Sequence, residues 1–108
     1  MIFLIYETDS GKCPYLQWES KLSSKDRGII SSRLSRIRLG NFGDCKSIKS
    51  KGLYELRIHY GSGYRIYFGK QNNQVILLLL GGDKKSQKKD IQKSYQFWQD
   101  YLESQKGK

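Results

Sequence analysis

The clearest alternation of polar and apolar residues lies between residues 53 and 68, in two runs separated by Gly61-Ser62-Gly63. A period of two is typical of β-strands whose two faces differ. Pairing Tyr60 with Tyr64 across a three-residue loop makes one face of the hairpin apolar or aromatic and the other polar. The alternation therefore predicts an antiparallel hairpin in one register, with these opposed pairs: Ile58 and Ile66, Leu56 and Phe68, His59 and Arg65, Arg57 and Tyr67.

A third strand is predicted over Val75 to Leu80, because six consecutive apolar residues are typical of a central strand buried on both faces. The turn before it, Gln71 to Gln74, suits a two-residue hairpin, since asparagine tolerates positive φ. With Gln71 opposite Gln74, we expect Leu77 and Leu79 to join the apolar face. The same register places two further leucines, Leu78 and Leu80, on the polar face beside Tyr67 and Arg65.

The remaining segments predict one more edge strand, one short strand and three helices. The edge strand covers Met1 to Thr8, and the short strand covers Cys45 to Ile48. Helical spacing of apolar residues indicates one helix from Pro14, a second from near Ser24 to Gly40, and a third that starts between Asp83 and Ser86 and ends near Glu103. This order predicts an α+β fold in which helices cover one face of an antiparallel sheet.

Length and charge narrow the class of protein. We expect a single domain over residues 1–108, and the formal charge of +10 predicts attraction to polyanions such as nucleic acid. The N-terminus lacks the pattern of a signal peptide or membrane span, so we expect a cytoplasmic protein with no membrane partner. Cys13 and Cys45 lie in no metal-like spacing and are expected to be free packing residues. No motif calls for a cofactor or a metal.

The polar face of the predicted hairpin carries the candidate chemistry. The odd-numbered positions of both strands share this face, which the helices are expected to leave open. They bring together Arg57, His59, Arg65 and Tyr67, and Lys84 can reach the rim. Fixed cations beside aromatic rings suit a nucleic acid, because guanidinium groups bind the phosphate backbone and rings stack on bases. His59 is the only histidine, and either a structural or an acid–base role is open to it. Glu55 shares this parity and is expected to pair with a cation, without a catalytic role.

Two further groups of cations have two interpretations. One interpretation of each group is a solvated helix face, and the other is a set of phosphate contacts. The candidate RNA-binding residues among them are Lys85, Lys88 and Lys89 at the third helix, and Arg36 and Arg38 at the end of the second.

Three segments resemble a known family of toxins. They are GNFGDCKSI at 40–48, GLYELRIHYGSGYRIYF at 52–68 and LLLLGGDKKSQKKDI at 77–91. They resemble the addiction-module killer proteins, the HigB-like branch of the RelE/ParE toxin superfamily, and the likeness covers nearly the whole chain. Ser62 stands where that family usually has proline, which should loosen the hairpin turn.

The resemblance implies a RelE-like fold and a toxin of a type II toxin–antitoxin pair. Its partner would be a small helix-turn-helix, HigA-like antitoxin with which it forms an oligomeric complex. RelE-like members cut mRNA on the ribosome, which favours a metal-independent endoribonuclease; ParE-like members poison DNA gyrase, and a non-catalytic nucleic-acid-binding module is a third alternative. The family's functional cations correspond to Arg57 of ELR, Arg65 of GYR and Lys84 of GGDK. His59 or Lys84 would act as base or acid, and Tyr67 would stack or donate a hydrogen bond.

Overall fold

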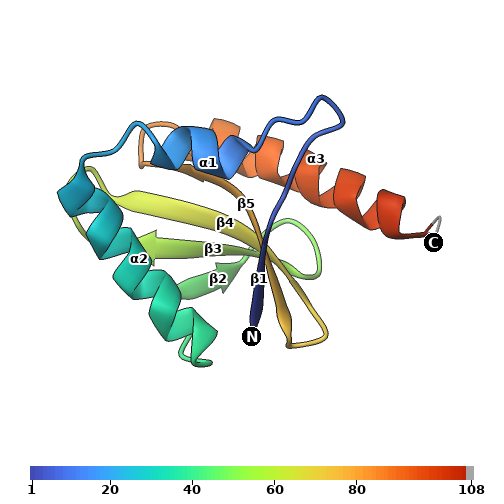
Figure 1. The fold of residues 1–108 in the computed structure, drawn as a ribbon, viewed down its shortest axis with the longest axis horizontal. Coiled ribbons are helices and arrows are strands. Elements are labelled where there is room, and N and C mark those ends of the chain that lie inside the picture. Colours follow the sequence, from blue (N-terminus) through green and yellow to red (C-terminus); the bar gives the residue numbers. More distant parts are fainter. Residues whose placement is uncertain (107–108) are drawn as a thin grey trace.

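A five-stranded mixed sheet forms the centre of the computed structural model, which describes residues 1–106 (Figure 1). The strand order is β1-β5-β4-β3-β2. The elements are β1 (Ile2–Ile5), α1 (Pro14–Glu19), α2 (Ser24–Arg38), β2 (Cys45–Ser47), β3 (Leu53–Ile58), β4 (Tyr64–Gln71), β5 (Val75–Gly82) and α3 (Gln87–Lys106). The α+β fold with two N-terminal helices, an antiparallel meander and a C-terminal helix is confirmed, and its arrangement is RelE-like. None of the helices within residues 1–106 is long and apolar enough to cross a membrane.

Local signals fix where the helices begin. α1 starts at Pro14, and α2 is capped by Ser23, whose Oγ accepts the backbone N–H of Asp26 at 3.1 Å. Before α3, Asp83 and Ser86 bond reciprocally: the Ser86 N–H donates to Asp83 Oδ1 at 3.1 Å and the Asp83 N–H to Ser86 Oγ at 3.3 Å. α1 and α2 therefore begin where the sequence predicted, and α3 begins at Gln87, one residue after the predicted range.

β1 lies at the edge of the sheet, as expected, but it runs parallel to β5. Its register places Ile2 beside Val75 and Ile5 beside Leu78. The sheet is therefore mixed, whereas the four strands β2 to β5 form the predicted antiparallel meander.

The predicted register of the β3–β4 hairpin is wrong by two residues. Ile58 lies opposite Tyr64, Arg57 opposite Arg65 and Glu55 opposite Tyr67. The connection is a five-residue loop, residues 59–63, in which Gly61 and Gly63 both have positive φ (57° and 78°). A shift of two residues leaves every side chain on its predicted face, so Arg57 and Arg65 still share a face.

The predicted register of β4 and β5 is also wrong. Gln71 lies opposite Val75, because Asn72 and Asn73 both adopt positive φ (52° and 56°) in a loop one residue longer than expected. This one-residue shift exchanges the faces of Leu77, Leu78 and Leu79. A β-bulge at Tyr67/Phe68 then returns Leu80 to its predicted face, but opposite Tyr67 and not beside Arg65 as predicted.

The two faces of the sheet carry separate cores, so the expectation of helices on one face only is wrong. α1 and α2 cover the first core, which includes Tyr15, Ile30, Ile37, Leu56, Ile66 and Phe68. α3 covers the opposite face and forms a second core with Tyr6, Leu53, Leu77, Leu79 and Trp98. Gly69 provides the flat surface that α3 needs, since a Cβ at this position would lie 2.0 Å from the Trp98 ring.

Cys13 and Cys45 are free thiols, in agreement with the sequence. Burial raises the pKa of Cys45 to about 11, so this thiol is neutral at physiological pH. Cys45 packs against the first core, as expected of a packing residue.

Candidate functional site

A concavity of about 330 Å³ opens where the β3–β4 loop meets the turn between β5 and α3. Arg57 and Arg65, directly opposite each other on β3 and β4, line it together with His59, Lys84 and the loop. We refer to these four side chains as the cation cluster. The structure therefore brings together four of the five residues predicted to be catalytic.

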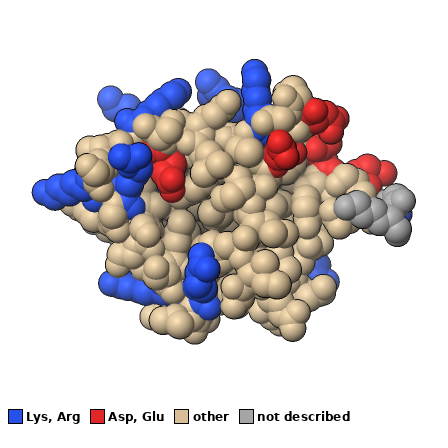
Figure 2. Space-filling model, in the orientation of Figure 1, with Lys and Arg blue, Asp and Glu red and all other residues tan. Residues whose placement is uncertain are grey.

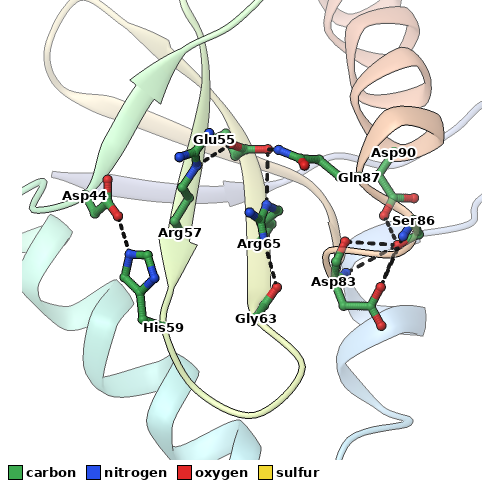
Figure 3. A network of polar contacts seen from close by, with 10 residues as sticks. All are labelled: Asp44, Glu55, Arg57, His59, Gly63, Arg65, Asp83, Ser86, Gln87 and Asp90. Atoms are coloured by element: carbon green, nitrogen blue, oxygen red, sulfur yellow. Dashed lines mark hydrogen bonds and ion pairs between the residues drawn. The ribbon is translucent and has the colours of Figure 1, made fainter.

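A buried carboxylate anchors the two arginines. Glu55 is fully buried, and its Oε1 accepts the Nε–H of Arg57 at 3.0 Å while its Oε2 lies 3.7 Å from Arg65 Nε (Figure 3). Gln87, in the first turn of α3, donates from Nε2 to Glu55 Oε2 at 3.0 Å. The expected pairing of Glu55 with cations is confirmed. Gln87 was not predicted, although it is the glutamine of the GGDKKSQKKDI segment.

Arg57 presents the open end of its guanidinium to solvent. Its Nε is bound to Glu55, its side chain is 33% exposed, and neither Nη atom donates a hydrogen bond within residues 1–106. The hydrogen bond to Glu55 raises the pKa of Arg57, so the group stays charged. A guanidinium held from the side in this way can bind two phosphate oxygens with its Nη pair.

Arg65 forms the floor of the concavity instead of projecting from an open face. It is 7% exposed, and its Nη1 donates to the carbonyl of Gly63 at 2.9 Å. The expectation of exposure is wrong because α3 covers this end of the face. A cation that is already desolvated and held in place interacts strongly with an anion that enters the concavity.

Tyr67 is the predicted site residue that the structure excludes from the concavity. It is fully buried opposite Glu55 and lines no part of the opening. Burial is the main cause that raises its pKa far above the ordinary value of a tyrosine. The ring is therefore inaccessible for stacking on a base, and the predicted position of Tyr67 on an open face is wrong.

His59 is held by Asp44. Its side chain is 76% exposed, and Nε2 lies 2.5 Å from Asp44 Oδ2 (Figure 3). This hydrogen bond lowers the pKa of Asp44, so the carboxylate is ionised and acts as acceptor for Nε2–H. Nδ1 then accepts a proton when the ring is neutral and donates one when it is charged, so His59 can act as a base or an acid. Asp44 was not predicted, and its signal is its place in the GNFGDCKSI segment.

Lys84 is exposed and lies at the opposite rim. Its aliphatic stem passes close to Gly63, where a Cβ would lie 3.1 Å from Lys84 Cγ. The turn that carries it is fixed by Ser86, whose Oγ donates to Asp90 Oδ2 at 2.5 Å (Figure 3). Glycine at position 63 therefore permits the close approach that brings Lys84 to the cluster.

The other predicted RNA-binding cations lie outside the concavity. Lys85, Lys88 and Lys89 border a separate shallow groove along α3. Arg36 and Arg38 lie in the last turn of α2, on the other side of the sheet, where the Arg38 guanidinium sits 4.5 Å from the centroid of the Phe3 ring. Figure 2 shows Lys and Arg side chains spread around the edge of the view, whereas most of the visible acidic ones gather near the end of α3. No group of three or more side chains that could hold a metal ion occurs within residues 1–106.

The arrangement of the sheet and the helices is that of a RelE-like protein. Residues 18–96 match the family of phage-derived Gp49-like proteins (DUF891), so the chain belongs to this family, which is part of the RelE/HigB-like toxin superfamily. An uncharacterized protein of Haemophilus influenzae is 46% identical over 78 residues, which cover 71% of this chain and 78% of the relative. The resemblance found in the sequence is thereby confirmed at the level of the superfamily, and the matched range includes the whole cation cluster.

Proposed function

We propose that this protein is the toxin of a type II toxin–antitoxin system and cleaves mRNA on the ribosome as a metal-independent endoribonuclease. The observation that carries the proposal is the pair Arg57 and Arg65, anchored on one buried carboxylate and opening with His59 and Lys84 onto a single concavity. Such a cluster of fixed cations beside a titratable histidine suits a phosphodiester whose negative charge increases during reaction.

The reaction is an attack within the substrate. The ribose 2′-oxygen forms a bond to the adjacent phosphorus while the bond from phosphorus to the 5′-oxygen breaks. One proton leaves the 2′-hydroxyl and one is given to the 5′-oxygen, so the products end in a 2′,3′-cyclic phosphate and a 5′-hydroxyl. The protein has to supply a base, an acid and charge stabilisation.

The cluster contains a group for each task. The open Nη pair of Arg57 binds the non-bridging phosphate oxygens, and Arg65 adds positive charge from the floor. One preorganised donor of this kind lowers the barrier by about 3 kcal/mol. His59 and Lys84, at the rim, carry the two proton transfers, and the contact with Asp44 leaves Nδ1 of His59 available for one of them.

Purified protein incubated with ribosomes that translate a defined mRNA tests this function. The proposal predicts fragments with cyclic phosphate and 5′-hydroxyl ends, and their loss in His59→Ala. A gyrase supercoiling assay runs in parallel. Intact mRNA together with inhibited supercoiling would favour the ParE-like alternative, and binding of RNA without any cleavage would favour the non-catalytic module.

The proposed partner is a small helix-turn-helix, HigA-like antitoxin. A chain of +10 charge, with a cation cluster that lines a surface concavity, suits a partner that places acidic or apolar side chains over these groups. Co-expression with the neighbouring helix-turn-helix gene should restore growth and give a complex that co-purifies. Persistent toxicity without a complex at moderate salt would contradict this assignment.

A further inference from the structure

A second groove, of about 390 Å³, lies between α1 and α3. Its floor is the part of β5 that extends past the end of β1: β1 pairs with β5 only as far as Ile5 and Leu78, whereas Leu80 and Gly81 line the groove. Figure 1 shows α1 and α3 above this end of β5. The part of β5 that β1 leaves unpaired therefore forms the floor of a groove between two helices.

Aromatic rings form two walls of the groove. Trp18 of α1 packs directly on Gly81, where a Cβ would lie 2.1 Å from its ring. Phe97 of α3 stacks on Tyr6, with ring centroids 5.1 Å apart. Trp18 and Phe97 are both only half-buried. Exposed ring surface of this kind can stack on a nucleic-acid base.

The charge of the groove is entirely positive. Lys12, Lys21 and Lys93 line it, and none of its lining residues within 1–106 is acidic. The groove of about 310 Å³ between β1 and α3 shows the opposite character, because Glu7, Asp9 and Asp100 line it. Electrostatics therefore directs an anion to the groove between α1 and α3.

The groove is linked to the cation cluster in two ways. The Trp18 ring makes an edge contact with Tyr64, at 5.9 Å between centroids, and Tyr64 directly follows Gly63 at the rim of the concavity. Lys93 also borders the shallow groove that contains Lys85, Lys88 and Lys89, and Lys85 directly follows Lys84 of the cation cluster along the chain. Cations and rings thus continue from one cavity to the other.

We propose that the groove between α1 and α3 is a second RNA subsite, which binds one nucleotide of a single strand that flanks the cleaved position. Its lysines hold the phosphate and its rings stack on the base. Cations combined with accessible rings are the features by which proteins hold single-stranded nucleic acid. The identity of this strand as the mRNA substrate rests on the proposed function. The binding of single-stranded RNA in the groove is independent of it.

The test measures binding without cleavage. A fluorescent single-stranded RNA with 2′-O-methyl groups, which removes the attacking hydroxyl, is titrated with protein at several salt concentrations. The test variant is Lys12→Ala/Lys21→Ala/Lys93→Ala. The control, Lys49→Asn/Lys51→Ala/Lys106→Ala, loses the same charge at lysines that line neither the groove nor the concavity.

The subsite predicts at least about a tenfold loss of affinity near 0.1 M salt for the groove variant, and a salt slope reduced by about 0.7, the value expected when one phosphate contact to a single strand is lost. The control should change the slope much less. RNA should also quench Trp18 fluorescence, while Trp98, which is 2% exposed, should not respond. Folding of both variants is checked by thermal melting.

The outcomes separate this inference from the proposed function. Equal binding by the groove variant and the control would overturn the subsite even if the wild type cleaves mRNA. Groove-dependent binding by a protein that cleaves nothing would leave the subsite standing and remove the nuclease proposal. Tighter binding of an acidic peptide than of RNA, lost in the groove variant alone, would assign the groove to a protein partner and overturn the subsite.

Discussion

The two faces of the sheet bury different kinds of residue. Under α1 and α2 the core is apolar, from Ile76 on β5 to Leu56 on β3. Under α3 the face is apolar only near Trp98, whereas the groups buried toward the start of the helix include Glu55, Arg65, Tyr67, Asp90 and Ser94. α3 is thus a core helix at one end and a support for charged residues at the other.

This polar end carries groups that folding alone does not favour. Tyr67 Oη and Ser94 Oγ are buried without a hydrogen-bond partner within residues 1–106, and the buried Arg65 Nε has only the ion pair with Glu55 Oε2 at 3.7 Å. A buried unpaired polar group costs about 1–3 kcal/mol. Such local violations are expected where a protein maintains a functional site, which agrees with the position of the cation cluster on this face.

The largest expected effect is that of Glu55→Gln. Removing the carboxylate leaves Arg57 and Arg65 opposite each other without an anion, and breaking a buried pair costs about 3 kcal/mol or more. We expect a loss of about 3 kcal/mol in the free energy of unfolding, measured with urea. Tyr54→Phe on the apolar face is the control and should change it by less than about 0.5 kcal/mol. A loss below about 1 kcal/mol for Glu55→Gln would show that the two faces do not differ in this way.

A matched pair of glycine substitutions compares how rigidly the faces are packed. Gly69→Ala would meet Trp98, which is 2% exposed and donates from Nε1 to the Lys51 carbonyl at 3.2 Å. Gly81→Ala would meet the half-buried Trp18, which has room to move outward. Overpacking costs about 1–3 kcal/mol of stability. We therefore expect the loss in the free energy of unfolding to be near the upper value for Gly69→Ala and near the lower value for Gly81→Ala. Thermal melting of both variants measures these losses, and a larger loss for Gly81→Ala than for Gly69→Ala would contradict the account.

Gln87→Ala tests whether α3 supports the arginines. The substitution removes one hydrogen bond to the Glu55 carboxylate, so the free energy of unfolding should fall by about 1.5 kcal/mol. We also expect the cleavage rate of bound substrate to fall while substrate affinity is kept, because Gln87 does not line the concavity. Lys88→Ala, one residue further along α3, is the control for stability. An unchanged rate would limit Gln87 to a role in folding.

The smallest effect concerns Asp90 and pH. Burial raises the pKa of Asp90, so the folded state binds its proton more readily than the unfolded chain. Asp90 therefore contributes to the stability of the fold at pH values below its pKa in the unfolded chain, about 3.9. This contribution is lost as pH rises through its higher pKa in the folded state. Compared with Asp90→Asn, the wild type should become relatively less stable as pH rises from about 4. Urea unfolding of both proteins across this range measures how the difference in their stability changes with pH. A wild type that becomes relatively more stable as pH rises would contradict this prediction.

Side-chain alternation was sufficient to predict the faces of β3 and β4 but insufficient for the registers. The error of two residues in the first hairpin left Arg57 and Arg65 together, because a register shift by an even number of residues keeps each side chain on the same face of the sheet. The error of one residue in the next hairpin exchanged Leu77 and Leu78, because no local signal distinguished a three-residue Asn loop from a two-residue one.

The position of α3 could not be obtained from its own pattern. Apolar spacing shows that the helix has a stripe to bury, but not which face of the sheet will receive it. Gly69, opposite Leu53 on β3, was the available signal that a large ring lies on that face. The burial of Arg65 and Tyr67 follows from this docking, as does the bond between Glu55 and Gln87, which are 32 positions apart.

The rate of mRNA cleavage by Arg57→Lys tests the central claim most directly. Lysine keeps the charge but cannot bind Glu55 and two phosphate oxygens at the same time. If the anchored arginine pair is the catalytic centre, the single-turnover rate on ribosome-bound mRNA should fall by about 100-fold or more. Lys85→Ala, which removes a charge outside the concavity, should change that rate by less than about threefold. An Arg57→Lys protein that cleaves at nearly the wild-type rate would contradict the account, because positive charge alone would then be sufficient.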